Sequence, residues 1–317
     1  MSAVLAIIPP EQHDRRRFIG GSDVAAVLGI SPWRTPLQLW EAKTRPALDG
    51  PEPAKRVFTR GQRWESVVAE MLVEHLTARG HTVEIVASNN RYVDPSLDFL
   101  AAEIDFEIKL DGEEEITNVE LKTVHPFKAK EWGEEDTDEV PLWYAAQAMH
   151  GLGVTDRRRC FVAPLFGADE IRAYEITRDE ETIAAMRARC QMFWHLVQTG
   201  VRPDPQNLAD LDRLYKGEDA TPTLIADEDL TRKVLRLRAI NAEIKARETE
   251  AAAVEFDVKL AMKDATELVI PDDDKKVAVV WKSRDYSWFD QAALKEDDAK
   301  LHRKYQRKTT SRPFTVK

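Results

Sequence analysis

The chain has 317 residues, a formal net charge of −10 and 43% hydrophobic residues, among them 8 Trp and 11 Phe. This length and composition predict one large domain with an appendage, or two domains, around a substantial core. The negative charge argues against a protein coated in positive charge for unspecific nucleic-acid binding, although a local basic groove remains compatible with it.

Two cysteines, Cys160 and Cys190, lie far apart in apolar or helical surroundings. We expect both to be free, buried thiols of an intracellular protein. Iron–sulfur and zinc sites usually take three or four Cys or His ligands at short spacing, so no Fe–S cluster is expected. The start has no signal-peptide pattern and no apolar run reaches the length of a membrane span, so we expect a cytoplasmic protein.

Hydrophobic periodicity predicts helices, then a mixed sheet, then helices over the first 200 residues, which is an α/β (α+β) domain. A turn is expected at Asn89-Asn90 and an acidic loop at 134–139. In chain order, the predicted elements are helices at 22–28, 35–44 and 57–79 with a loop at 45–53, strands at 81–87, 104–110 and 119–123, a helix at 141–153, strands at 158–164 and 170–177, and a helix at 178–199.

Three arginines at 15–17 precede the pair Gly20-Gly21 and a short helix that Ser22 or Asp23 can cap. A helix start with arginines nearby is a natural site for a phosphate. The alternative is an ordinary capped helix with a solvated basic lead-in, and these residues alone favour neither.

One acid, Glu65, falls on the apolar side of the long helix predicted at 57–79 when residues are placed at 100° intervals. A carboxylate on a core-facing stripe needs a partner or a metal. It can pair with Arg60 or Arg63, or it can reach the acids of the predicted sheet.

The stretch 100–124 reads as two strands joined by an acidic turn at Asp111-Gly112. Period-2 alternation points Glu120 and Lys122 from one face of the second strand, and pairing of the strands can bring Asp105 beside them. Two carboxylates on strands can hold Mg²⁺, and an adjacent lysine can act on the attacking water. The alternative is a solvated sheet face with a cross-strand ion pair.

The helix that Pro141 opens places Tyr144, Gln147 and Gly151 on one face. These polar side chains can be satisfied core groups, or they can hold a water or a phosphate.

The rest of the chain differs in character. Residues 201–226 are predicted as a Pro/Asp-rich linker, and 227–317 as a C-terminal extension with a long charged helix at 227–264 and a strand at 277–282. The segment 300–317 has seven Lys/Arg and no acid. It is a candidate nucleic-acid arm, or a solvated tail that balances the acidic segment before it.

Together these features resemble the YqaJ-type viral recombinase family, relatives of phage lambda exonuclease among the PD-(D/E)xK nucleases. The resemblance covers roughly residues 15–194. It rests on five signals in the family's order: Arg15 with Ile19-Gly-Gly-Ser-Asp23, Gly61-Gln-Arg-Trp-Glu65, Ile104-Asp105, Glu120-Leu-Lys122 and Tyr144-Ala-Ala-Gln147.

The resemblance implies a PD-(D/E)xK core in which Asp105 and Glu120 bind Mg²⁺, or Mn²⁺ as a substitute. The backbone carbonyl of Leu121 is the implied third ligand. Lys122 matches the catalytic lysine, and Glu65 matches the helix acid that holds metal directly or through water.

It also implies that Gln147 lies near the attacking water and that Arg15 and Ser22 bind the 5′-phosphate end. Arg16 and Arg17 are adjacent alternatives to Arg15, and Arg17 and Tyr144 are included among the expected DNA-binding residues. The sequence departs from the family where the usual Pro-Asp-Gly around the first metal acid is replaced by Glu103-Ile-Asp105-Phe.

The implied activity is a metal-dependent DNA exonuclease that degrades duplex ends from the 5′ side in phage or prophage recombination, in the cytoplasm of a bacterial host. The implied partners are duplex DNA ends, a single-strand annealing protein and two further copies of the chain in a ring-shaped trimer. Two other interpretations remain open: an endonuclease on the same core, and a non-catalytic DNA-binding recombination module.

Overall fold

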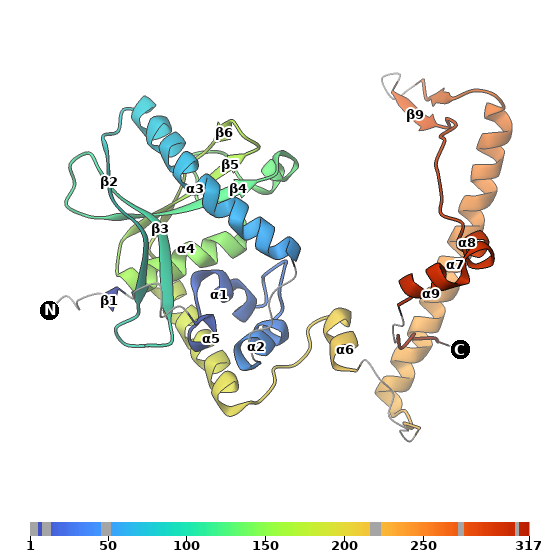
Figure 1. Ribbon diagram of the computed structural model, residues 1–317, viewed down its shortest axis with the longest axis horizontal. Helices are drawn as coiled ribbons and strands as arrows, with labels where there is room; N and C mark the ends of the chain where they lie inside the picture. Colours follow the sequence, from blue (N-terminus) through green and yellow to red (C-terminus); the bar gives the residue numbers. More distant parts are fainter. Residues whose placement is uncertain are drawn as a thin grey trace. The chain divides into compact units, whose positions relative to one another are not determined.

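A computed structural model describes residues 6–7, 14–45, 52–215, 223–271, 276–307 and 311–316, with backbone alone at 6–7 and 52–62. The chain divides into two compact units, Met1–Leu211 and Asp212–Lys317. We describe each unit by itself (Figure 1). Most of the loop predicted at 45–53 lies outside the described residues.

The first unit alternates helices and strands in an order close to the predicted one. Its elements are β1 (Ala6–Ile7), η2 (Arg15–Arg17), α1 (Gly21–Val27), α2 (Pro36–Thr44), α3 (Glu52–Ala78), β2 (Val83–Val93), β3 (Ala101–Leu110), β4 (Thr117–Val124), η3 (Pro126–Glu131), α4 (Leu142–Thr155), β5 (Arg159–Phe166), β6 (Glu170–Ile171), β7 (Tyr174–Thr177) and α5 (Glu180–Thr199), followed by α6 (Leu208–Leu214) at the unit boundary.

One mixed sheet organises this unit. Its described strands run in the order β1-β2-β3-β4-β5-β6, and β7 also pairs with β5. The β4–β5 pair is parallel, and the other pairs are antiparallel. A parallel pair needs a crossover, which α4 supplies between β4 and β5. The predicted α/β class with a mixed central sheet is confirmed.

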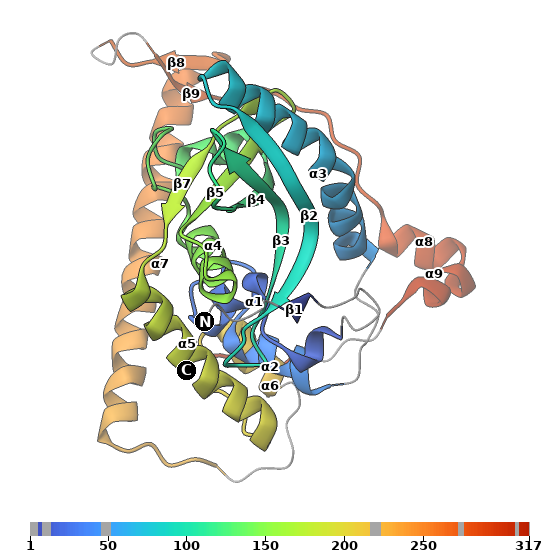
Figure 2. The same cartoon turned by 90° about the vertical axis from the view of Figure 1, so that its left-hand side faces the viewer.

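The two faces of the sheet are covered by different helices, as Figure 2 shows for α3 and α4. The amphipathic helix α3 places Val68, Leu72 and Leu76 against Val119 and other apolar side chains of the strands. On the opposite face, α4 packs on the sheet, with α1 and α5 beside it. Both faces are therefore covered, and β5 is buried at seven of its eight positions and β4 at the first five of its eight.

Strand β3 departs from the simple alternation expected of it. Ile104 packs in the cluster that contains α4, whereas Phe106 and Ile108 pack in the cluster that contains α3. Glu107 is buried in an ion pair with Arg157. The apolar side chains of β3 thus change from one face of the sheet to the other next to Asp105, whose carboxylate accepts a hydrogen bond from the next strand.

Two turn predictions had different outcomes. The turn at Asp111-Gly112 is confirmed, because both residues have positive φ, the conformation that a tight antiparallel connection requires. The turn at Asn89-Asn90 is wrong. Strand β2 continues to Val93 and absorbs the irregularity as a bulge near Ala87 and a left-handed Asn89, which asparagine tolerates.

Smaller corrections concern a helix cap and a strand. Helix α1 is capped by Gly20, whose N–H donates to the Asp23 carboxylate, so neither Ser22 nor Asp23 occupies the cap itself. The strand predicted at 170–177 is split into β6 and β7, which pair with different parts of β5.

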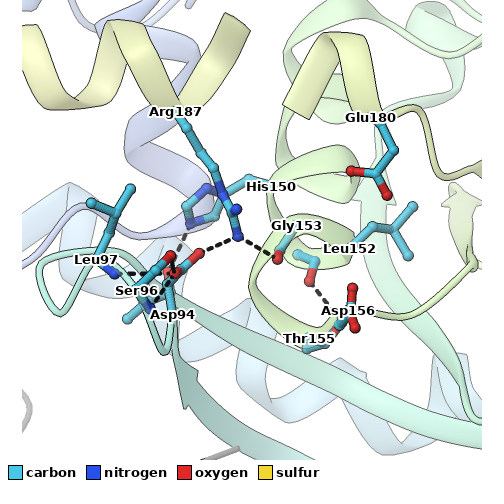
Figure 3. A network of polar contacts seen from close by, with 12 residues as sticks. Asp94, Ser96, Leu97, His150, Leu152, Gly153, Thr155, Asp156, Glu180 and Arg187 are labelled. Carbon is cyan, nitrogen blue, oxygen red and sulfur yellow. Dashed lines mark hydrogen bonds and ion pairs between the residues drawn. The ribbon is translucent and has the colours of Figure 1, made fainter. Parts of the chain in front are cut away.

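A buried carboxylate fastens the β2–β3 loop to the helices. Asp94 accepts hydrogen bonds from the Ser96 backbone and hydroxyl, at 2.9 and 2.6 Å, and forms an ion pair with Arg187 of α5. In Figure 3 the Arg187 side chain reaches between this loop and α4, where it donates to the Gly153 carbonyl at 2.8 Å. The loop before β3 is thereby held in one position relative to α4.

The second unit contains the long helix α7 (Glu228–Met262), β8 (Glu267–Val269), β9 (Val277–Val280), α8 (Gln291–Asp297) and α9 (Ala299–Tyr305). The predicted long helix, capped by Asp227, and the predicted strand are confirmed. Within the segment predicted as a linker, α6 carries a fully buried Asp210 that accepts a hydrogen bond from Thr35, so part of that segment packs on the first unit. Residues 216–222 of it lie outside the described residues. Among the helices described, none is both long and apolar enough to cross a membrane.

Candidate active site

A cleft of about 420 Å³ lies in the first unit among β2, β3, β4, α1 and α4. Seven of the predicted site residues line it: Arg15, Ser22, Asp105, Glu120, Lys122, Tyr144 and Gln147. These residues come from four separate stretches of the sequence, so their convergence is a product of the fold.

The two strand acids are held by different contacts. The Asp105 carboxylate accepts a hydrogen bond from the Leu121 N–H at 2.8 Å, which joins β3 to β4 where the regular ladder has ended. The Glu120 carboxylate is almost fully buried and is contacted by the side chains of Lys122 and Gln147. Glu120 and Lys122 therefore share one face of β4, as the alternation predicted.

The charges of these groups depend on one another. Burial raises the pKa of Asp105, and burial together with the nearby Asp105 charge raises the pKa of Glu120 to about 7. Burial alone would lower the pKa of Lys122, but the Glu120 and Asp105 carboxylates outweigh it and raise that pKa. Lys122 is therefore an ammonium at neutral pH, and its Nζ also lies 5.4 Å from the Tyr144 ring centroid.

Helices α1 and α4 meet closely at the cleft. A Cβ on Gly21 would lie 3.1 Å from the Cγ of Gln147, so glycine permits the approach that places Gln147 against Glu120. Tyr144, one turn earlier on α4, faces the same cleft.

The basic end of the cleft is built around Arg15. Its Nη2 donates to the Ser22 hydroxyl at 2.6 Å, and its guanidinium stays half exposed. Below it, Lys43 donates to the carbonyls of Arg15 and Phe18 and to Asp23, at 2.5, 2.6 and 2.6 Å. The backbone that carries Arg15 is thus fixed from the interior.

Other predicted site residues lie outside the cleft lining. Arg17 is exposed in η2, and Arg16 pairs with Asp14. Glu65 lies on α3 near the strand acids; burial raises its pKa, and the charges of Asp105 and Glu103 raise it further. Leu121 contacts Asp105 through its N–H, and the ligand role of its carbonyl stays a prediction.

The structure also brings residues into the cleft that the sequence did not single out for it. Arg91, Phe18 and Asn118 line it, as does the buried thiol of Cys160, whose pKa burial raises well above its usual value. The cysteines are free and buried, as expected. In the sequence Arg91 looks like an ordinary strand residue. Its place in the cleft follows from the β2–β3 register, in which Arg91 lies opposite Glu103.

The donor set of the cleft fits a hard divalent cation. Asp105 and Glu120 are two buried or half-buried carboxylates whose pKa values burial raises, so a bound cation would stabilise their charged forms in place of the lost solvent. Mg²⁺ commonly binds through one or two carboxylates and keeps several waters. Among the described residues no group of three or more His, Cys, Asp or Glu side chains forms a metal cage.

Comparison with known proteins agrees with the resemblance. Residues 12–158 match the family model of the YqaJ-like viral recombinase domain. The chain is 28% identical over 312 residues to the uncharacterized protein YqaJ of Bacillus subtilis, covering 96% of this chain and 92% of the relative.

Among solved structures, an alkaline exonuclease from Laribacter hongkongensis aligns with a TM-score of 0.43 at 15% identity, covering 59% of this chain and 91% of its own. A phage-related exonuclease from Haemophilus somnus aligns with a TM-score of 0.39 at 13% identity, covering 58% and 95%. The family match spans every predicted site residue from Arg15 to Gln147. Residues 12–158 of this chain are therefore similar to the YqaJ-like viral recombinase domain.

Proposed function

We propose that this protein is a metal-dependent DNA exonuclease that hydrolyses phosphodiester bonds at duplex ends, from the 5′ side, in phage-type recombination. The observation that carries the proposal is the single cleft in which Asp105, Glu120 and Lys122 lie together with the basic end formed by Arg15 and Ser22. Degradation of one strand from a duplex end would supply the single-stranded DNA that an annealing partner requires.

The carboxylates of Asp105 and Glu120 would hold Mg²⁺, or Mn²⁺ in its place. When bound, such a cation activates water and neutralises the charge that develops on the scissile phosphate. In this structure the Glu120 carboxylate is paired with Lys122 and Gln147. A bound cation would take the place of Lys122 as the partner of that carboxylate and free the Lys122 ammonium for the substrate.

Lys122 is the group suited to the reacting phosphate. Because its pKa is raised, it serves as a hydrogen-bond donor that orients the attacking water and stabilises the negative charge of the transition state. Gln147, held against Glu120, would hold the water on the side of α4. Arg15 and Ser22 would bind the terminal phosphate and so place the first phosphodiester bond at the acids.

The experiment is digestion of linear duplex DNA whose two strands carry different labels, with and without a 5′-phosphate, in Mg²⁺. Wild type is compared with Lys122→Ala and with Lys130→Ala, a matched control at an exposed lysine of η3. We expect Mg²⁺-dependent loss of the 5′-terminated strand, reduced at least about 100-fold in Lys122→Ala only.

A covalently closed circle separates the exonuclease from its alternatives. An exonuclease leaves the circle intact, whereas cutting of the circle would establish an endonuclease on the same core. Binding of every substrate without hydrolysis, in Mg²⁺ and in Mn²⁺, would reject catalysis and leave a DNA-binding recombination module.

The ring-shaped trimer and the annealing partner belong to this proposal as well. A ring with DNA threaded through it would confine positive potential to the inside of an acidic protein, in keeping with the net charge of −10. Sedimentation of a strict monomer that still degrades DNA processively would reject the ring.

A further inference from the structure

A buried arginine outside the predicted catalytic set lines the same cleft. Arg91 of β2 has a side chain that is 5% exposed and lies opposite Glu103 of β3 in the antiparallel register. Its Nη2 donates to the Glu103 carboxylate at 3.0 Å. Its guanidinium carbon lies 4.6 Å from the centroid of the Phe18 ring. The guanidinium is therefore fixed in orientation by two neighbours.

These two contacts leave most of the guanidinium unused. A guanidinium carries five N–H donors, and Nε and Nη1 of Arg91 have no hydrogen-bond partner among the described residues, although both atoms are buried. An unsatisfied buried donor on a charged group is costly, so such groups are normally paired. Full pairing of Arg91 calls for an acceptor from outside the described protein atoms.

The position of Arg91 indicates which acceptor this is. A Cβ on Gly20 would lie 3.4 Å from the Phe18 ring and 3.7 Å from Nη2 of Arg15, so Arg15 and Phe18 adjoin Gly20. Arg91 stacks on the same Phe18 ring. The two arginines thus occupy the same end of the cleft, around Phe18 and Gly20.

Glu103 explains why this end of the cleft needs a second arginine. Its carboxylate lines the cleft beside Arg91, and its side chain is 48% exposed. Left unpaired, this carboxylate would repel an incoming phosphate, whereas Arg91 neutralises it and still has a fork of N–H groups to offer. Guanidinium forks match phosphate oxygens in geometry as well as in charge.

We propose that Arg91 is a second arginine of the terminal-phosphate site, and that its Nε and Nη1 donors bind oxygens of the 5′-phosphate monoester beside Arg15. This inference rests on the proposed function, in which a DNA end enters this cleft. Arg91 then determines specificity: it selects ends that carry a phosphate and leaves the hydrolytic groups unchanged.

The test is a binding measurement that needs no hydrolysis. Full-length protein carrying Lys122→Ala is titrated, with Ca²⁺ replacing Mg²⁺, into a duplex labelled at its far end that carries either a 5′-phosphate or a 5′-hydroxyl. Fluorescence anisotropy gives Kd for each end. The ratio of the two Kd values measures phosphate recognition apart from contacts along the duplex.

Adding Arg91→Gln should raise Kd for the phosphorylated end about 10- to 100-fold and leave Kd for the hydroxyl end within about 2-fold. Arg91→Lys keeps the charge but loses the fork, so it should give a smaller rise on the phosphorylated end alone. Arg158→Gln removes the same charge from an exposed side chain outside the cleft and should leave the ratio unchanged.

A folded Arg91→Gln protein with the wild-type ratio, or with equal loss on both ends, would overturn the inference. If Arg91→Gln does not fold by circular dichroism, Arg91→Lys decides by the same ratio. Failure of the two proposals is distinguishable. If the wild-type protein selects the phosphorylated end through Arg91 but never hydrolyses DNA, only the exonuclease proposal is rejected. If it digests DNA ends but binds phosphorylated and hydroxyl ends equally, only the Arg91 inference is rejected.

Discussion

The ammonium of Lys43 and the carboxylate of Asp23 lie 2.6 Å apart in the interior of the first unit, with both side chains 3% exposed. Burial by itself would raise the pKa of Asp23, but the charges of Lys43 and Arg15 hold it below its usual value. The same ammonium is bonded to the carbonyls of Arg15 and Phe18. One buried ion pair therefore links α1 and α2 to the backbone that carries the basic end of the cleft.

Removal of Lys43 should be severe. Lys43→Met preserves the stem but leaves Asp23 buried without its nearest cation, so we expect the free energy of unfolding to fall by about 3–5 kcal/mol. Lys130→Met, at an exposed lysine, should change it by less than about 0.5 kcal/mol. Denaturation followed by tryptophan fluorescence measures both. A loss below about 1 kcal/mol in Lys43→Met would contradict the assignment of Asp23 as an ionised, Lys43-dependent group.

The stability of the metal-free protein should depend on pH through Glu120. Its pKa in the fold is about 7, above the usual 4.5, so the folded state binds a proton that the unfolded state has lost between these values. The contribution of this group is therefore fully present below about pH 4.5 and is lost as the pH rises through about 7.

Glu120→Gln removes this titration. The Tm difference between the Gln variant and wild type should shift in favour of the variant by about 2–6 °C as the pH rises from about 5 to 8 in EDTA. Glu114→Gln, at a fully exposed side chain, should show no such shift. A Tm difference independent of pH would contradict the raised pKa. Mg²⁺ should raise the Tm of wild type at pH 8 and have a smaller effect on Glu120→Gln.

The part of the site that the sequence predicted best depends on local geometry. Glu120 and Lys122 are two residues apart on one strand, and Tyr144 and Gln147 are three apart on one helix, so periodicity alone places each pair on a common face. Both faces are confirmed by the structure. The cleft then follows from the packing of α4 on β3 and β5, the strands on either side of β4.

What the sequence did not reveal depends on contacts between distant segments. The change of face in β3 lies next to Asp105, whose carboxylate accepts a hydrogen bond from Leu121, sixteen positions away, and no repeat pattern encodes that contact. Arg91 acquires its neighbours from the register of β3 and from the turn that carries Phe18. Asn89 looked like a turn because asparagine favours left-handed backbone, but the pairing of β2 with β3 outweighs that local preference.

The ion pair between Arg187 and Asp94 should contribute strongly to stability. The Asp94 side chain is fully buried, and Arg187→Met would leave it with hydrogen bonds only from the loop it belongs to. We expect a loss of about 2–3 kcal/mol in the free energy of unfolding. Arg189→Met, at an exposed arginine of the same helix, is the matched control and should cost little. Equal effects of the two substitutions would show that the pair seen in Figure 3 adds nothing.

The close approach of α1 to α4 should affect activity without lowering stability to the same degree. A Cβ at Gly21 would lie 3.1 Å from Gln147, so Gly21→Ala displaces the side chain that contacts Glu120. Alanine itself is favourable in a helix by about 0.5–1 kcal/mol relative to glycine, which offsets the cost of the contact. On the proposed function, we expect kcat to fall about 10-fold while the Tm changes little.

Gly153 supplies the control within α4. A Cβ there would lie 3.1 Å from Ile183, the same separation, but in the apolar core and away from the cleft lining. Gly153→Ala should therefore change the Tm while leaving kcat per folded molecule near the wild-type value. If Gly153→Ala lowers kcat as much as Gly21→Ala does, the effect is general to α4 packing, and the specific placement of Gln147 by Gly21 is wrong.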